Sequence, residues 1–177
     1  MYTFDSSTLL NWITAFAIFE IPMANFYLSM SGKDDVITNW YSGKTINIWN
    51  VIAQDSLYVI CGIIVTYTLF NYLLKKNIIK ENFLYFVLLF IFVQIVGDLT
   101  FALIITTWPK KYSTKWINYF KNYIKKAEYS ALFGDTLYII AWTLAYYVLS
   151  KHIQPTFSQQ IAILCTFLFL VSAYSVR

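Results

Sequence analysis

The sequence predicts an all-α protein, a polytopic bundle of transmembrane helices that forms one domain over residues 1–177. The first observation is composition. Of the residues, 59% are hydrophobic and 12% are charged, about half of the ~25% charged residues usual in soluble domains. The second is that five stretches reach the roughly 20 apolar residues needed to cross the hydrocarbon core of a bilayer. Backbone groups in lipid must bond internally, and these stretches lack barrel-like alternation, so we expect helices.

The five expected spans follow one another with short links, which leaves no room for a separate soluble domain. They cover residues 9–30, 46–74, 83–108, 131–150 and 159–176. Glu20 and Pro22 interrupt the first span, and Pro109 ends the third. The second is long enough to tilt or to project from the bilayer. The first residues lack the basic stretch of a cleaved signal peptide, so we expect the first span to be retained.

A further, amphipathic helix is expected over residues 114–128, between the third and fourth spans. It follows a capping signal at Ser113 and Thr114. Apolar residues recur at helical spacing on one face: Trp116, Ile117, Phe120, Tyr123, Ile124 and Ala127. Lysines occupy the opposite face: Lys115, Lys121, Lys125 and Lys126.

This pattern is typical of a helix that lies in the membrane interface, with Trp116 and Phe120 among the headgroups and the lysines towards anionic lipid. A solvated connector is the alternative interpretation. Nucleic acid is not an expected partner, because the apolar face would then need another surface to cover it. The lipid bilayer and anionic headgroups are the expected partners, together with a second copy of the chain.

The links also predict an orientation. The links on the amino-terminal side carry four basic residues: Lys75, Lys76, Lys80 and Lys151. The opposite side carries nine: Lys33, Lys44, Lys110, Lys111, Lys115, Lys121, Lys125, Lys126 and Arg177. The positive-inside bias therefore places the amino terminus outside and the carboxyl terminus in the cytosol.

Four acids lie within four different expected spans: Glu20, Asp55, Asp98 and Asp135. An ionised acid at a helix centre costs ~2.5–3.5 kcal/mol on insertion scales, and such residues usually face the bundle interior. At 1.5 Å rise per residue, Glu20, Asp55 and Asp98 lie roughly 13–15 Å from the cytosolic ends, close to mid-membrane. Asp135 lies at ~6 Å unless its helix begins before Ala131.

Two of the acids open a repeated motif. Asp55-Ser56-Leu57-Tyr58-Val59-Ile60 is matched by Asp135-Thr136-Leu137-Tyr138-Ile139-Ile140. The expected topology places both copies on helices that run from the cytosol outwards, with Asp98 on the antiparallel helix between them. The repeat argues that the fourth helix begins early, so that Asp135 lies as deep as Asp55.

Two interpretations of these acids stay open. Carboxylates close together cannot all ionise, so they could share a proton or bind a cation, as in a small channel or transporter. This candidate ion or proton site comprises Asp55, Asp98, Asp135, Glu20, Tyr58, Tyr138 and Gln94. Alternatively, each acid bonds to a neighbouring polar residue and joins helices, as in a structural or organising membrane protein.

Other chemistry has little support in the sequence. The single His152 excludes a histidine-based metal cluster, and Cys61 and Cys165 lie apart in apolar runs. No cofactor is expected, and the identity of any metal stays open. Intramembrane aspartyl proteases carry a Gly-x-Gly-Asp motif. In this chain the position of the first glycine is occupied by Ile95 before Asp98 and by Leu132 before Asp135. Such an enzyme is therefore a distant third interpretation.

From Gln94 onwards, roughly a third of the chain resembles small multi-pass membrane proteins of large nucleocytoplasmic DNA viruses. Three motifs carry the resemblance: Gly97-Asp98-Leu99-Thr100-Phe101, Trp116-Ile-Asn-Tyr-Phe-Lys-Asn-Tyr123 and Ala131-Leu-Phe-Gly-Asp-Thr-Leu-Tyr138. The chain departs from the family pattern at Gly97, where a histidine is usual, and at Glu128-Tyr129. The resemblance implies a viral protein of a host membrane or the virion's internal membrane, with other virion proteins as partners, and implies no activity.

Overall fold

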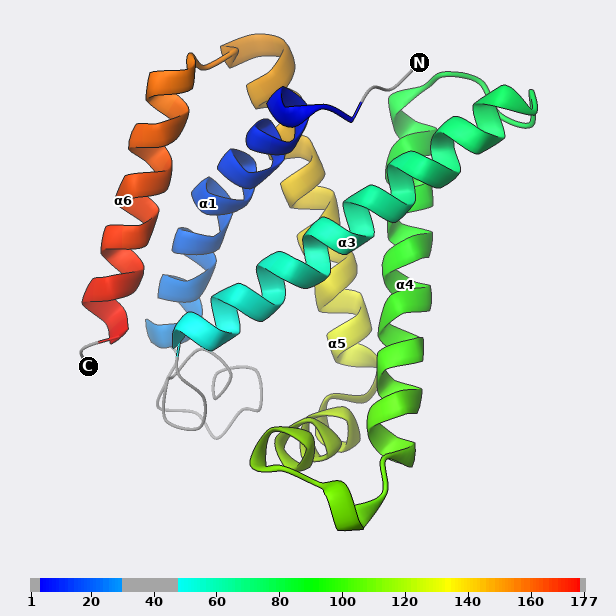
Figure 1. The fold of residues 1–177 in the computed structure, drawn as a ribbon, viewed down its shortest axis with the longest axis vertical. Helices are drawn as coiled ribbons and strands as arrows, with labels where there is room; N and C mark the ends of the chain where they lie inside the picture. Colours follow the sequence, from blue (N-terminus) through cyan, green and yellow to red (C-terminus); the bar gives the residue numbers. More distant parts are fainter. Residues whose placement is uncertain (1–3, 30–47, 176–177) are drawn as a thin grey trace.

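The computed structural model describes residues 4–29 and 48–175, and this part of the chain folds into helices without strands. The elements are α1 (Ser6–Ser29), α3 (Ile48–Lys75), α4 (Phe83–Thr107), η1 (Lys110–Tyr112), α5 (Lys115–Val148), η2 (Leu149–Ile153) and α6 (Phe157–Ser175) (Figure 1). The predicted all-α class is therefore confirmed. The expected link at 31–45 with Lys33 and Lys44, the side chain of Pro22, and Arg177 lie outside the described residues.

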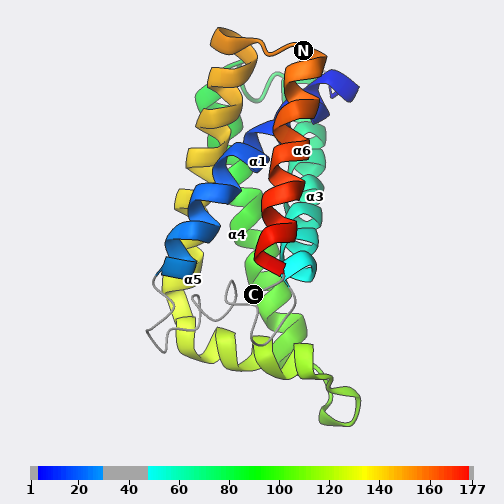
Figure 2. The ribbon, with the colours of Figure 1, turned by 90° about the vertical axis from the view of Figure 1, so that its left-hand side faces the viewer.

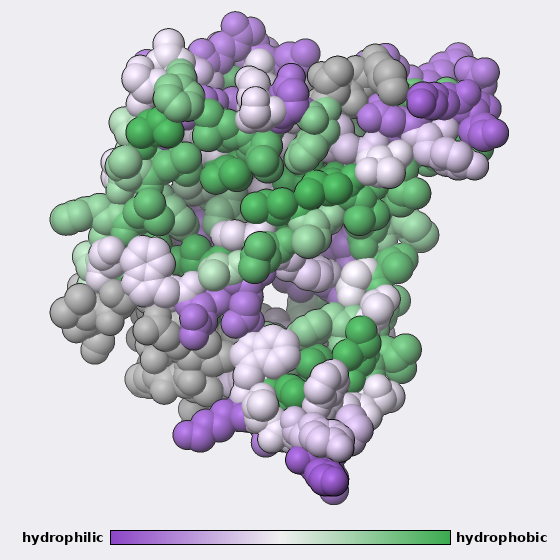
Figure 3. Space-filling model, viewed as in Figure 1, coloured by the Kyte–Doolittle hydropathy of each residue, from purple (hydrophilic) through white to green (hydrophobic). Residues whose placement is uncertain are grey.

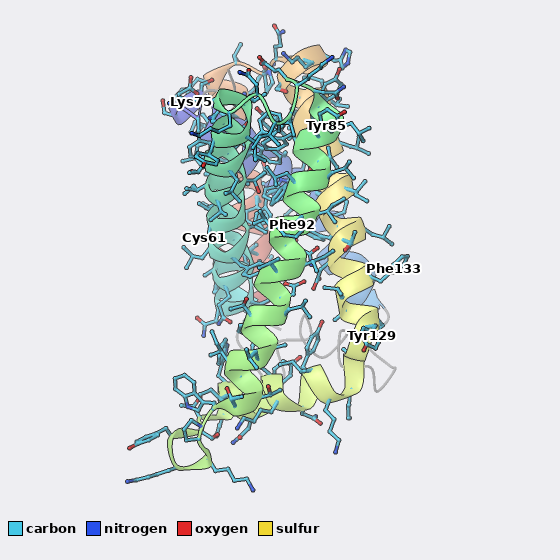
Figure 4. All side chains as sticks on the ribbon, turned by 90° about the vertical axis from the view of Figure 1, so that its right-hand side faces the viewer. Cys61, Lys75, Tyr85, Phe92, Tyr129 and Phe133 are labelled. Atoms are coloured by element: carbon cyan, nitrogen blue, oxygen red, sulfur yellow. The ribbon has the colours of Figure 1, made fainter. Side chains whose placement is uncertain are left out.

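Three helices are long and apolar enough to cross a membrane. They cover Trp49–Lys75, Phe83–Thr107 and Tyr129–Ile153. α6 contributes a shorter apolar helix over Phe157–Ala173. Large apolar side chains point away from the bundle along the outer faces of α4 and α5, as Phe92 and Phe133 show (Figure 4). These two side chains are 59% and 68% exposed, which suits an apolar surrounding.

The long helices run alongside one another in alternating directions. α3 and the later part of α5 run the same way, and α4 packs against both of them in the opposite direction (Figures 1 and 2). α1 and α6 pack together on the other side of α5. The links at 76–82 and 154–156 lie at the end where α1 begins, and the link at 108–114 lies at the opposite end (Figure 1).

Helix ends follow local signals. Asn82 accepts a hydrogen bond from the Leu84 N–H at 2.8 Å and caps α4, which ends just before Pro109, a residue that disfavours helix behind it. Thr114 caps α5 by accepting from the Ile117 N–H at 3.2 Å, as the sequence predicts. Asn77, in a left-handed conformation with φ of 54°, ends the turn after α3.

The sequence was expected to form two helices over 114–128 and 131–150, whereas the structure has a single helix, α5. The helix continues through 129–130 but changes direction there, and the candidate span begins at Tyr129. The first part of α5, residues 115–128, lies across one end of the bundle, and the remainder runs up through it (Figure 2). We call residues 115–128 the surface segment.

Aromatic rings around Trp12 form the centre of the bundle. The Trp12 side chain is fully buried and stacks on the Tyr146 ring with centroids 3.9 Å apart. Its indole N–H donates to the Tyr67 hydroxyl at 3.3 Å, and the Trp142 indole N–H donates to the Trp12 carbonyl at 3.2 Å. The Phe90 ring packs edge-on against Trp12. Side chains of α1, α3, α4 and α5 thus meet here, which fixes how the helices pack around the acids.

Candidate functional site

Asp98 on α4 is the centre of one polar cluster. The Tyr58 hydroxyl of α3 donates to one carboxylate oxygen, and the Gln94 amide, one turn earlier on α4, donates to the other. The Gln94 side chain is itself buried. The Asp98 carboxyl group is partly exposed, and both of its oxygens accept a hydrogen bond from a neighbouring side chain.

The cluster reaches a third helix through Gln94. The Thr136 hydroxyl of α5 lies 3.3 Å from the Gln94 side-chain oxygen, to which it can donate, and also bonds to the Leu132 carbonyl at 2.8 Å. Tyr58, Asp98, Gln94 and Thr136 therefore form a continuous hydrogen-bonded chain across α3, α4 and α5. We call these four residues the Asp98 cluster.

Glu20 belongs to a different pair of helices. Its side chain is only 1% exposed, and the Tyr138 hydroxyl of α5 donates to its carboxylate. The Tyr138 ring packs against Phe19 with ring centroids 4.9 Å apart. The Glu20–Tyr138 pair thus joins α1 to α5, whereas the Asp98 cluster joins α3, α4 and α5.

Asp55 and Asp135 lie near the surface segment, in the neighbourhood of Tyr123. Burial raises the pKa of the Tyr123 phenol above its ordinary value. The negative charges of Asp135, Asp55 and Asp98 raise this pKa further. The charges of all three aspartates therefore act on the Tyr123 phenol, and the Asp135 side chain is exposed. An opening separates α3 from the surface segment in the space-filling view (Figure 3).

The two repeats adopt equivalent positions. Leu57 and Leu137 are both at least half exposed, at 63% and 50%, and the following residues, Val59 and Ile139, are both buried. Each tyrosine donates to an acid on another helix, Tyr58 to Asp98 and Tyr138 to Glu20. The repeated motif is therefore a repeated structural unit. Each copy directs a leucine outwards and a tyrosine to an acid.

The second residue of each repeat differs in its surroundings. Thr136 joins the Asp98 cluster, as described above. Ser56 lines a cavity of about 70 Å³ between α1, α3 and α5, whose other walls are apolar and include Phe16, Ile60 and Trp142. The equivalence of the repeats is therefore confined to the leucine, the tyrosine and the buried residue that follows.

The surface segment contacts the bundle at Gln54 of α3, at Phe101 of α4 and at the end of α4. The Trp116 indole N–H donates to the Gln54 side-chain oxygen of α3 at 2.8 Å. The Phe120 ring packs on Phe101 of α4 with centroids 5.1 Å apart, and Trp116 also contacts Phe101. Lys121 donates to the Trp108 carbonyl at 2.6 Å, where α4 ends. The apolar face thus packs partly on protein, while Lys115, Lys125 and Lys126 are exposed.

The structure therefore groups the expected site residues in two sets and not one. Among the described residues, no set of three or more acidic, histidine or cysteine side chains is arranged to hold a metal ion. Sequence reasoning placed Gly97 only in a motif and missed Gln54 as a partner of Trp116. The sequence feature that could have identified these two residues is their position beside an acid, because Gly97 precedes Asp98 and Gln54 precedes Asp55.

Comparison of the chain with protein-family models, with curated proteins and with solved structures finds no match.

Gly97 makes room for the Tyr58 hydroxyl. A β-carbon at position 97 would lie 2.6 Å from that oxygen, well inside contact distance. Gly134 stands in the same position relative to Asp135, yet a β-carbon there would meet nothing within 4 Å. The two glycines are therefore a matched pair, of which only one is required for close approach.

We predict that Gly97→Ala lowers the free energy of unfolding by about 1–3 kcal/mol, because the added methyl group displaces the Tyr58 hydroxyl from Asp98. Gly134→Ala should be neutral or stabilising by up to ~1 kcal/mol, because alanine favours helix. Denaturant titration of the two purified variants in detergent micelles measures both effects. Equal losses at the two positions would contradict the assigned contact.

Proposed function

We propose that this chain is an integral membrane protein with five spans, and that it is a structural protein in which acid–tyrosine pairs hold the spans together. α1, with 24 residues, and α6, with 19 residues, are ~36 Å and ~28 Å long at 1.5 Å per residue. Both lengths are close to the ~30 Å hydrocarbon thickness. They pack alongside the three candidate spans, which supports five crossings.

The observation that carries the structural role is the division of the acids between helix pairs. The Tyr58–Asp98 bond joins α3 to α4, and the Tyr138–Glu20 bond joins α1 to α5. Side-chain hydrogen bonds between helices favour association in lipid, where water cannot compete for the polar groups.

The surface segment fits a position in the membrane interface. Its contacts are with Gln54, six residues after the start of α3, and with Phe101, six residues before the end of α4. Six residues of helix correspond to ~9 Å, so the segment lies beside the ends of the spans. On this arrangement Asp55 and Asp98 are close to the interface and not at mid-membrane as expected from counting.

The excess of lysines at the end that carries the surface segment favours a cytosolic location for that end, with the amino terminus outside. The resemblance to viral membrane proteins leads us to propose a host or virion membrane as the site, with other virion proteins or a second copy of the chain as partners.

Labelling with a membrane-impermeant maleimide tests the five-span topology. Cys61 and Cys165 lie within α3 and α6, so the native chain in sealed membranes should resist labelling. We expect Lys80→Cys and Lys111→Cys to be labelled from opposite sides of the membrane. Labelling of both variants from the same side would overturn the topology.

Double-mutant cycles test the structural role. Tyr58→Phe combined with Asp98→Ala, and Tyr138→Phe combined with Glu20→Ala, should each show a coupling free energy of about 0.6–2 kcal/mol in detergent unfolding. The crossed control, Tyr58→Phe with Glu20→Ala, should be additive to within ~0.5 kcal/mol because the two residues are not bonded. Coupling as large in the control as in the bonded pairs contradicts the assignment.

A proton channel or transporter is a second candidate, favoured by the continuous chain of hydrogen-bonding groups in the Asp98 cluster. Its acid could release a proton to water and take one up again. This function predicts a proton flux in proteoliposomes. Asp98→Asn should abolish the flux, because an amide does not titrate, whereas Glu20→Gln should change the flux by no more than about twofold. Flux no faster than through empty liposomes would eliminate this candidate and leave the structural role.

A further inference from the structure

The chain concentrates positive charge between Asp98 and Glu128. This stretch contains six lysines and no acidic residue. They are Lys110, Lys111, Lys115, Lys121, Lys125 and Lys126. All six belong to η1 or to the surface segment, at one end of the bundle. Lys121 donates to the backbone at the end of α4. The other five are exposed, and we call them the basic end surface.

Aromatic residues accompany these lysines. Trp108 and Tyr112 are 39% and 63% exposed, and the Trp108 indole N–H donates to the Tyr112 carbonyl at 3.2 Å, which fixes the corner between α4 and α5. The Lys111 ammonium lies 5.6 Å from the centre of the Tyr112 ring. Tryptophan and tyrosine are enriched at membrane interfaces, where one end of the ring is apolar and the other is wet.

The fold determines where these charges lie. Because Trp116 and Phe120 pack on α3 and α4, the apolar side of the surface segment is turned towards the bundle. Lys115, Lys125 and Lys126 lie on other sides of the helix and remain exposed. Their long side chains can reach laterally to the headgroup layer while their charges stay in water.

We propose that the basic end surface binds the headgroup phosphates of anionic lipids. The inference rests on the proposed membrane topology, since the five lysines are then at the height of the headgroups. Charge complementarity supports it, because five exposed ammonium groups without an acidic neighbour in the intervening sequence face a surface rich in phosphate. Each lysine close to an anionic surface favours association about fivefold.

The chain contains its own control. Lys75 and Lys76 form another exposed doublet, at the opposite end of the bundle, and the Lys76 ammonium lies 6.0 Å from the centre of the Tyr72 ring. This doublet resembles Lys110 and Lys111 in chemistry, but no surface segment accompanies it. Its neutralisation changes the net charge of the protein as much as neutralisation of one doublet of the basic end surface does.

The full chain is reconstituted in vesicles of equal parts phosphatidylcholine and phosphatidylglycerol and then extracted in a mild detergent. The retained lipids are quantified by mass spectrometry. The wild type should retain phosphatidylglycerol over phosphatidylcholine. Lys125→Gln with Lys126→Gln should lower this preference about 25-fold, as should Lys110→Gln with Lys111→Gln. Lys75→Gln with Lys76→Gln should leave it within about twofold.

Absence of a preference in the wild type, or equal losses from all three doublets, would overturn the proposal. The unfolding midpoint of each variant in detergent is compared with that of the wild type to detect misfolding. A variant that misfolds is replaced by its Lys→Arg counterpart, which keeps the positive charge and should keep the lipid preference. The maleimide labelling described above distinguishes failure of the lipid-binding proposal from failure of the proposed topology. Correct labelling with no lipid preference refutes this inference alone, whereas labelling from one side refutes the topology on which it rests.

Discussion

The hydrogen bond between a tyrosine hydroxyl and a buried carboxyl group is the interaction on which this bundle depends. In hydrocarbon, a polar group without a protein partner costs several kcal/mol, because no water can replace the missing bond. Glu20 and Asp98 meet that constraint with partners on other helices. An acid that needs a hydrogen-bond partner in lipid therefore favours one particular neighbour. Apolar contacts between side chains that resemble lipid are less selective.

The repeats show how one local pattern serves two interfaces. Each copy presents a tyrosine on the helix face that also carries the buried Val59 or Ile139, so the phenol is aimed between helices by ordinary packing. Which acid it meets is decided by the neighbouring helix. At α3 the approach of α4 is close enough that Gly97 touches the phenol oxygen, whereas at α5 the partner is the buried Glu20 of α1.

Much of the fold could be predicted because its signals are local. Apolar length predicts the helices, and Pro109 and Thr114 mark the boundaries that the structure places beside them. The two helices expected over 114–128 and 131–150 are one continuous helix, but its direction changes close to the expected boundary, where the candidate span Tyr129–Ile153 begins. The pairing of acids could not be predicted. Tyr58 and Asp98 are 40 residues apart, and helix packing alone selects the partner. The bonding of Glu20 to Tyr138, and not to the residues around Asp98, depends on the packing of α1 against α5.

The Glu20–Tyr138 bond has a consequence for biosynthesis. The two residues are 118 positions apart, so a ribosome adding about 5–20 residues per second completes α1 several seconds before it makes Tyr138. During that interval Glu20 of α1 is without the phenol that later donates a hydrogen bond to it. Asp98, by contrast, is synthesised after Tyr58, so its hydrogen-bond partner is already present when it emerges. The Glu20–Tyr138 bond therefore forms later than the Tyr58–Asp98 bond, which α3 and α4 can make as soon as α4 emerges.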